Sequence, residues 1–489
     1  MTASRIRRVK CDEAKPWCTR CTTTGRQCDG YAERDAHVSK LAYPIALSQT
    51  LPLHQHSTLL EKRAFHFFRC QTVPSISGYF QDDVWGRLVL QLSHVEPAVR
   101  HAVNALGALH EEQHLRCTGH DDMRYRSTTL DSFSTQQYAN ALERVQTLTA
   151  SSRPLTEVVV VCALVCIHFE ALRGNSQAAL LHIENAIKIL VASKTLLSHE
   201  IDSDLVCAMM RVDLQSSMYL GSRVPGLPFF TISIDAILPA TFTSVAHARS
   251  LVDTWGCRQL YFIRSVADKY KFLQPGDVPL EVIGQSHELA KVFNKLDRLL
   301  SDFIQRTSCI TPPERCGLDI LSGRVKTMRT MVATCLYSEE TAYDAHFDDF
   351  CQIYSICEGV VASGNAGHCL WSVSLDEGLL HPLYCIATSC RDGLLRHKAL
   401  TQLQELPGAE GIWHVQAITY LAMRCVEFEE RFCGQDLPRC DDIPEWKRIH
   451  SAGFRSLGHS LLPRITAFIR TRPNGMDGEW QDDEWTITW

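Results

Sequence analysis

The stretch TEVVVVCALVCIHFEALRGNSQAALLHIENAIKILVAS, residues 156–193, decides the fold class of this chain. It predicts two helices joined near Gly174 and Asn175, because these residue types favour a helix end followed by a new start. The first of the two helices is nearly all apolar, so we expect it to lie in the centre of a core. The stretch therefore predicts a helical hairpin.

Helical patterns continue on both sides of this hairpin. Residues 97–114 place apolar side chains on one helical face, starting with a helix-opening Pro97. Further helices are predicted near residues 246–269, 279–305, 317–337, 376–391, 411–431 and 443–470. Residues 221–239 are rich in Gly, Pro and β-branched residues and predict a loop with at most a short strand. The fold class is therefore all-α.

The composition bounds the class of protein. The 489 residues are 45% hydrophobic and 21% charged, as in a soluble globular protein of several structural units. The longest apolar run, residues 158–167, is far shorter than the ~20 residues of a membrane-spanning helix, so no membrane partner is expected. The chain has 21 cysteines and opens with no apolar leader, which indicates a reducing compartment and, after residue 31, buried free thiols.

Charge is distributed unevenly along the chain. Residues 1–31 carry seven Lys or Arg against three acidic residues, a net charge of +4 within a chain of net charge −6. The rest of the chain is therefore at −10. A basic arm on an acidic body indicates that the arm meets a polyanion, and nucleic acid is the polyanion we expect.

The basic arm also holds four cysteines. RIRRVKCDEAKPWCTRCTTTGRQCDGY, residues 5–31, contains Cys11, Cys18, Cys21 and Cys28 at the spacing C-x6-C-x2-C-x6-C. Thiolates so close together in a short polar segment are typical of a zinc site, because zinc takes four soft ligands and supplies the folding free energy that such a segment lacks. Disulfide pairing is the alternative, and the reducing context disfavours it.

This segment resembles the binuclear zinc cluster of fungal transcription factors. The basic run, the step Lys10-Cys11-Asp12, the loop proline Pro16 and Gly25 before the last cysteine all match that pattern. The helical body is more loosely similar to the regulatory domain that follows such clusters. The resemblance implies a small DNA-binding module with Zn²⁺ as its cofactor, followed by a large helical regulatory domain.

The family pattern has two further cysteines, seven and ten residues before Cys11, where this chain has Ser4 and Met1. In the family, six thiolates hold two zinc ions, and the first and fourth cysteines bridge them. Three explanations stay open: an incomplete start, which we favour, a truncated natural form, or a degenerate finger. One zinc held by all four thiols is a further possibility, and it requires Cys11 and Cys28 to approach each other.

The resemblance also implies how DNA would be bound. Basic residues between the second and third cysteines of the family read a CGG-like triplet in the major groove. Here Lys10 is the candidate for the guanine edge, because guanine O6 and N7 accept hydrogen bonds only from a donor. The candidates for phosphate contacts are Arg5, Arg7 and Arg8, with Lys15 and Arg20 as weaker ones. A solvated basic tail or a nuclear-import signal is the simpler interpretation.

The domain organisation follows from these patterns. We expect a partial zinc cluster at 1–31, a linker at 32–57, a helical regulatory domain at 58–470 and an acidic-aromatic tail at 471–489. The tail alternates acidic residues with Trp480, Trp485 and Trp489, a composition typical of activation segments that bind a coactivator. The alternative is a tail whose tryptophans dock on the helical body, since large aromatic side chains are seldom left in water.

A rival motif lies at residues 110–120. HEEQHLRCTGH has the zinc-protease pattern H-E-x-x-H, with His110 and His114 on one helical face, Glu111 as a candidate general base and His120 as a third ligand. Cys117 stands where that pattern needs a glycine to turn the chain back. His110 also continues an apolar face, so helix packing explains it better than metal binding.

Together these observations predict a nuclear, sequence-specific DNA-binding transcription regulator without enzymatic activity. Its partner is double-stranded DNA with CGG-like half-sites. The alternative in another class is a helical regulatory or interaction protein whose finger no longer binds DNA. A metalloprotease is a distant third.

Overall fold

The structure is a computed structural model, and it describes only part of the chain. The described residues are 57–80, 84–117, 124–150, 155–193, 201–221, 223–227, 238–273, 275–307, 310–363, 377–406, 408–431, 433–455, 464–475 and 478–488. The chain divides into two units, residues 1–50 and residues 51–489, and the described residues all belong to the second. The predicted zinc-cluster segment lies outside them, and so does the predicted linker up to residue 56.

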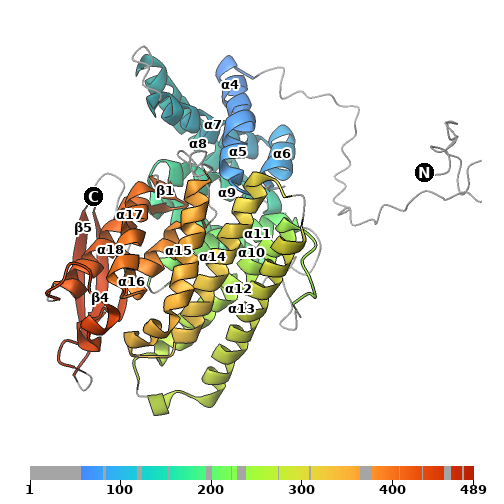
Figure 1. Ribbon diagram of the computed structural model, residues 1–489. Helices are drawn as coiled ribbons and strands as arrows, with labels where there is room; N and C mark the ends of the chain where they lie inside the picture. The colour runs from blue at the N-terminus through green and yellow to red at the C-terminus, as the bar shows by residue number, and fades with distance from the viewer. Residues whose placement is uncertain are drawn as a thin grey trace, which may run out of the picture. The chain divides into compact units, whose positions relative to one another are not determined.

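The first half of the described unit is helical (Figure 1). Its elements are α4 (Leu59–Phe67), η1 (Phe68–Thr72), α5 (Val73–Ser77), η2 (Val84–Val89), α6 (Leu90–Val95), α7 (Pro97–Cys117), α8 (Arg124–Thr149), α9 (Thr156–Leu172), α10 (Ser176–Ala192) and α11 (Ser203–Met218). α7 packs against α4, α8 and α9, so it joins the N-terminal helices to the centre of the domain.

The second half continues as helices and then ends in a small sheet. Its helical elements are α12 (Val245–Ser265), η5 (Ala267–Lys269), η6 (Pro275–Asp277), α13 (Leu280–Arg306), α14 (Pro312–Thr334), η7 (Glu340–His346), α15 (Phe347–Ala362), α16 (Leu380–Ser389), α17 (Gly393–Glu405), α18 (Val415–Glu430), η9 (Cys440–Asp442) and η10 (Glu445–Lys447). Its strands are β1 (Ala409–Glu410), β2 (Trp413–His414), β3 (Ser451–Phe454), β4 (Arg464–Thr471) and β5 (Gln481–Thr488).

The predicted hairpin of α9 and α10 is confirmed. In α9, the residues from Glu157 to Ala171 are buried with the exception of Ala163, and the helix packs against α7 and α10. Gly174 follows the helix with φ 72°, a left-handed conformation that residues with a Cβ seldom adopt. The side chain of Asn175 then caps α10 by accepting from the amide of Ala178 at 3.3 Å.

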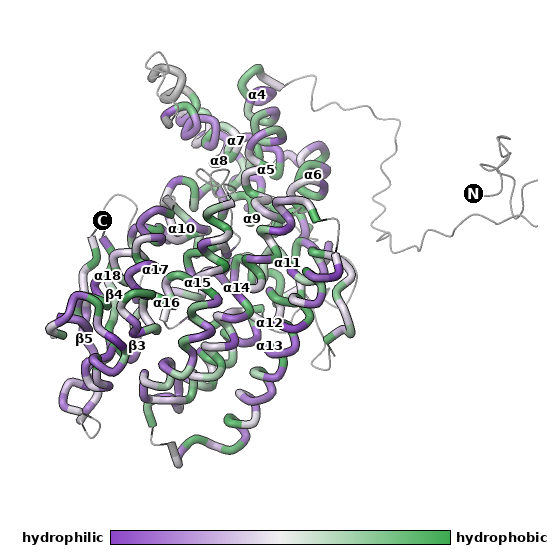
Figure 2. The backbone as a smooth tube through the Cα atoms, in the orientation of Figure 1, coloured by the Kyte–Doolittle hydropathy of each residue, from purple (hydrophilic) through white to green (hydrophobic). Residues whose placement is uncertain are grey.

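α13 shows how the amphipathic helices cover the core. In Figure 2 this helix carries both hydrophilic and hydrophobic residues along its length. Phe293, Leu296 and Leu300 are fully buried against α12 and α14, in a second apolar cluster beside the main one. α14 begins with a capping box between Thr311 and Glu314, which fixes its start next to α13.

The predicted all-α fold class is confirmed, and so are the helices predicted near 246–269, 279–305, 317–337, 376–391 and 411–431. The helix predicted over 443–470 is wrong. Pro444 is followed by η10, β3 and, after residues that are not described, β4. β4 alternates buried and less buried residues along RITAFIRT, which is the period of a strand and not of a helix.

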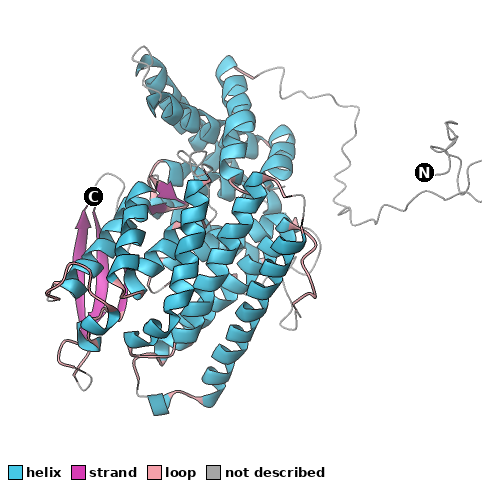
Figure 3. Cartoon of the chain, viewed as in Figure 1, coloured by secondary structure: helices cyan, strands magenta, loops and turns pink. Residues whose placement is uncertain are grey.

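A three-stranded antiparallel sheet in the order β3-β4-β5 closes this end of the domain (Figure 3). β4 pairs with β5 from Arg464↔Thr488 to Thr471↔Gln481. The separate acidic-aromatic tail predicted at 471–489 is therefore wrong for its described residues, since 481–488 form β5. The two described tryptophans dock as the alternative predicts: the ring of Trp480 lies 4.9 Å from those of Phe272 and His450, and Trp485 packs against the main core. Trp489 lies outside the described residues.

Within the part of the chain that the structure describes, no helix is both long and apolar enough to cross a membrane. The thiols of Cys162 and Cys166 are free and buried, as predicted for small apolar side chains, whereas Cys70 is exposed.

Candidate functional site

The residues predicted to bind zinc and DNA lie outside the described residues. They are Cys11, Cys18, Cys21 and Cys28 for zinc, and Arg5, Arg7, Arg8, Lys10, Lys15 and Arg20 for DNA. The donor set itself can be tested against the metal. Four thiolates are the number and the kind of ligand that one tetrahedral zinc takes, whereas two zinc ions sharing bridging thiolates need six. In number and kind, the four cysteines match the ligands of one tetrahedral zinc ion.

The H-E-x-x-H residues on α7 have structural partners. The Nδ1 atom of His110 lies 3.0 Å from the hydroxyl of Thr72, and the carboxylate of Glu111 accepts hydrogen bonds from Arg63 at 2.6–3.1 Å. Burial and the neighbouring His114 lower the pKa of His110 to about 4. Among the described residues, no group of three potential ligands is placed to hold a metal, and His120 lies outside them.

A cavity of about 680 Å³ lies between the helices and the C-terminal sheet. Its walls come from the end of α11, from α12, α14, α15, α16 and α18, and from β3, β4 and β5. Phe468 of β4 is one of the lining residues, and its ring lies against Gly221 and Gly453. A Cβ added at Gly221 would lie 2.3 Å from this ring, and a Cβ added at Gly453 would lie 2.9 Å from it. The two glycines therefore let the sheet approach the end of α11.

Aromatic side chains line the inner wall. The ring of Tyr219 lies 5.5 Å from that of Tyr384 and 6.0 Å from that of His381, both on α16. Burial, Arg324 and Arg264 lower the pKa of His381 to about 4, so its imidazole is neutral near pH 7. Burial and Glu377 raise the pKa of the neighbouring Cys385 to about 12, so its thiol stays protonated. The part of the wall that these four side chains form is therefore largely aromatic and uncharged.

Lys271 and Arg264 are two of the cationic side chains that line the cavity, and they differ in their partners. The Nζ atom of Lys271 donates to the carboxylate of Glu340 at 3.0 Å and to the carbonyl of His450 at 3.1 Å. Arg264 forms an ion pair with Asp268 at 3.3 Å and donates to the carbonyl of Met218 at 3.4 Å. Its Nε atom is buried without a hydrogen-bond partner among the described residues. Arg264 therefore has an N–H group that is not used in a hydrogen bond within the described part of the chain.

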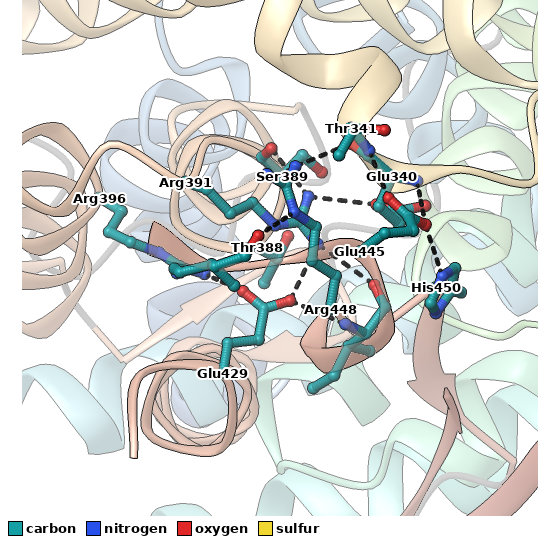
Figure 4. Close-up of polar contacts among 12 residues, drawn as sticks. Glu340, Thr341, Thr388, Ser389, Arg391, Arg396, Glu429, Glu445, Arg448 and His450 are labelled. Atoms are coloured by element: carbon teal, nitrogen blue, oxygen red, sulfur yellow. Dashed lines mark hydrogen bonds and ion pairs between the residues drawn. The ribbon is translucent and has the colours of Figure 1, made fainter. Parts of the chain in front are cut away.

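A buried ionic network includes Glu340, the partner of Lys271, and links it to Arg391 and Glu429 (Figure 4). Arg391 contacts Glu340 at 3.2 Å and Glu429 at 2.9 Å, and Arg396 contacts the other oxygen of Glu429 at 2.7 Å. The side chains of Arg391 and Arg396 are completely buried. Burial by itself would raise the pKa of Glu429, but the two guanidinium groups and hydrogen bonds, including one from the Ile449 amide, lower it to about 2.

A second part of the network fixes the loop before β3. Glu445 accepts from the amide of Glu340 at 2.8 Å and from that of Thr341 at 2.9 Å, and the imidazole of His450 lies 2.7 Å from it. Arg448 donates two hydrogen bonds of 2.8 Å to the carboxylate of Asp344. The loop that leads into β3 is thus held against η7, and this places β3 beside the cavity.

Neither the cavity nor the network can be read from the sequence alone. The residues that line the cavity come from segments between 218 and 482 that no local pattern connects. The sequence offers only a weak sign of the network. Arg391 and Arg396 each follow an apolar residue, and this hints that the two arginines are buried.

Two known domains match the chain. Residues 4–37 match the fungal Zn(2)-Cys(6) binuclear cluster domain, and residues 63–211 match the fungal specific transcription factor domain. The first covers the predicted cysteines and basic residues. The second runs from α4 to the middle of α11 and includes the α9–α10 hairpin.

Curated relatives agree with both domains. The chain is 31% identical over 265 residues to the aspercryptin biosynthesis cluster-specific transcription regulator of Emericella nidulans, which is 45% of this chain and 41% of that protein. It is 30% identical over 203 residues to a transcription regulator of Purpureocillium lilacinum, 38% of this chain and 48% of the relative. It is also 49% identical over 37 residues to a transcriptional regulatory protein of Schizosaccharomyces pombe, 8% of this chain and 7% of that protein.

The matched part thus spans less than half the length of these relatives. None of the solved structures matches the chain.

Proposed function

Since the chain carries the zinc-cluster and regulatory domains of the fungal Zn(2)-Cys(6) transcription factors, we propose that it is a nuclear regulator of transcription that binds DNA sequence-specifically. The observation that carries the proposal is the match over residues 4–37, where four cysteines stand among basic residues. A net charge of +4 on residues 1–31, in a chain that is otherwise acidic, supports nucleic acid as the partner.

Zinc gives this segment its fold in the proposal. Cys11, Cys18, Cys21 and Cys28 would hold the metal as thiolates, and the basic residues beside them favour the deprotonated form. Bound zinc would supply the folding free energy that a short polar segment cannot obtain from a core. The role of the protein is to present its basic residues in one fixed arrangement.

The basic residues divide into two roles. Lys10, next to Cys11, would donate to the O6 and N7 atoms of a guanine in a CGG-like triplet, and this contact would carry sequence information. Arg5, Arg7 and Arg8, with Lys15 and Arg20, would contact phosphates and give affinity that falls as salt rises. The helical domain would carry the regulatory function.

A competition experiment tests this assignment. The full chain is mixed with a labelled CGG-containing duplex, and unlabelled CGG and scrambled duplexes compete for binding. We expect a preference for CGG that Lys10→Ala reduces by about tenfold or more, since one good base contact is worth about 1–3 kcal/mol. Lys291→Ala, on the exposed side of α13, is the matched control and should change nothing.

Arg8→Ala separates the two roles. We expect this variant to weaken binding to both duplexes equally and to lower the slope of log K against log[salt] by about one. Equal affinity of the unaltered chain for CGG and scrambled duplexes would contradict the proposal.

The second candidate is a regulatory or interaction protein that binds no DNA. The observation that favours it is Ser4 and Met1 at the positions of two family cysteines. The Met1→Cys/Ser4→Cys chain, made with an added initiator methionine, decides between the two. Absence of CGG binding in both chains would leave only the second candidate.

A further inference from the structure

The cavity between the helices and the sheet has the size and the lining of a small-molecule site. Its volume of about 680 Å³ falls in the range that holds a drug-sized ligand. Aromatic and apolar side chains form about half of the wall, and polar or charged side chains form the rest; the first group includes Tyr219, Tyr384, Phe350, Phe454 and Met331. Such a wall suits a ligand that has both an apolar ring and polar groups.

The polar groups on the wall define what the ligand must offer. Arg264 is the charged group with unused capacity: its Nε atom has no partner among the described residues, and its two contacts are 3.3 and 3.4 Å long. The hydroxyl of Tyr219 is likewise buried without a partner in the described part of the chain. Both groups can donate hydrogen bonds, so they require an acceptor, and a guanidinium prefers a carboxylate.

The threonines on the wall can accept hydrogen bonds from a ligand, whereas Arg264 and Tyr219 can donate them. The hydroxyls of Thr327, Thr330 and Thr388 already donate to backbone carbonyls one turn earlier, at 2.8–3.1 Å. A hydroxyl oxygen that has used its proton can still accept. These three positions therefore suit a ligand that carries its own hydroxyl group.

The other cations of the wall have closer ion pairs than the 3.3 Å pair of Arg264 with Asp268. Lys271 is paired with Glu340, and Arg470 is held by both oxygens of Asp482 at 2.6–2.7 Å. At the sheet side the cavity reaches the surface, because the side chains of Arg455 and Asp482 are about half exposed. A ligand could therefore enter between the helices and the sheet.

We propose that this cavity binds a small ring-containing carboxylic acid that carries a hydroxyl group, with the carboxylate at Arg264 and Tyr219 and the ring between Tyr219, Tyr384 and Met331. The site would give the helical domain a small-molecule ligand. This binding is independent of the proposed DNA function, so it is measured on the full chain without DNA.

Titration calorimetry with 6-hydroxy-2-naphthoate tests the proposal, and 6-hydroxy-2-naphthamide is the uncharged probe of the same shape. We expect the acid to bind at least tenfold more tightly than the amide. Arg264→Met should weaken the acid about ten- to hundredfold, because it removes a charge-assisted contact but keeps the apolar volume. Arg315→Met on α14, with a side chain that is 54% exposed, is the control and should bind like the unaltered chain.

Tyr219→Phe is a second variant that tests the carboxylate contact even if Arg264→Met does not fold. This change removes a hydroxyl that has no partner in the described structure, so folding loses no hydrogen bond, yet the acid should bind about three- to tenfold more weakly. The proposal is overturned if neither probe binds, if acid and amide bind equally, or if both variants bind the acid like the unaltered chain.

Discussion

In α9 the buried side chains from Val158 to Ile167 are apolar. Just after α16, by contrast, three charged side chains are buried together: Arg391, Arg396 of α17 and Glu429 of α18. Apolar packing is non-directional, so each contact contributes a little and a missing methyl group is tolerated. A buried ion network is different, because removing one member leaves its partners charged and without water. Both regions are buried, but a small chemical change should lower the free energy of unfolding much more in the ionic network than in α9.

The largest effect is expected for Glu429→Gln, which changes one atom. Arg391 and Arg396 would then share a neutral group instead of a carboxylate, and buried pairs broken in this way cost about 3–5 kcal/mol of unfolding free energy. Urea unfolding followed by circular dichroism measures this loss. Glu427→Gln, on the same helix with a 60% exposed side chain, should stay within about 0.5 kcal/mol of the unaltered chain.

The network also predicts an acid-sensitive stability. The pKa values of Glu429 and Glu445 are lowered to about 2, so each carboxylate contributes stability above the unfolded pKa near 4.5, and this contribution is lost as the pH falls toward 2. The contribution is on the order of 3 kcal/mol per carboxylate.

Urea midpoints measured at pH 5, 4 and 3 test this, since they should decrease steadily for the unaltered chain. Glu445→Gln should be less stable at pH 5 and show a shallower decrease. A stability that does not change between pH 5 and 3 would show that these carboxylates are not held ionised.

A conservative change in the apolar region should be mild. Ile167→Val removes one methylene group from a fully buried side chain of α9, and such changes cost about 0.5–1.5 kcal/mol. The same urea experiment measures it beside Glu429→Gln. A loss as large as that of Glu429→Gln would remove the distinction between the two regions.

The smallest effect is expected for an ion pair at the surface of the sheet. Arg470 and Asp482 lie opposite each other in β4 and β5, with side chains 32% and 46% exposed. Asp482→Asn should cost less than about 1 kcal/mol, and raising the salt concentration should shrink the difference. A larger loss would mean that the sheet, and not the buried network, holds this end of the domain together.

The two regions also differ in what sequence alone could predict. The α9–α10 hairpin was predicted because its apolar run and the pair Gly174-Asn175 are local signals. The helix over 443–470 was predicted wrongly, although RITAFIRT has the alternation of a strand. The partners of this strand are set by tertiary contacts: β4 pairs with β3, for example Ala467 with Phe454. No local sequence pattern predicts that pairing.

The candidate sites show the same contrast. The zinc and DNA residues were predicted from spacing within about 30 residues, because metal ligands and a basic run are local features. The cavity was not predicted, because Tyr219, Arg264 and His381 become neighbours only through the packing of α11, α12 and α16. Unused hydrogen-bond capacity, such as that of Arg264, is visible only once the partners of each group are known.

In the proposed function, zinc-bound thiolates hold the basic residues in the arrangement that binds DNA. The most direct test measures the zinc content of the full chain together with its preference for a CGG duplex over a scrambled one, before and after zinc is removed with a chelator. We predict bound zinc, a preference that disappears on chelation and a return of both when zinc is restored. A chain without zinc, or a preference that survives chelation, would contradict the account.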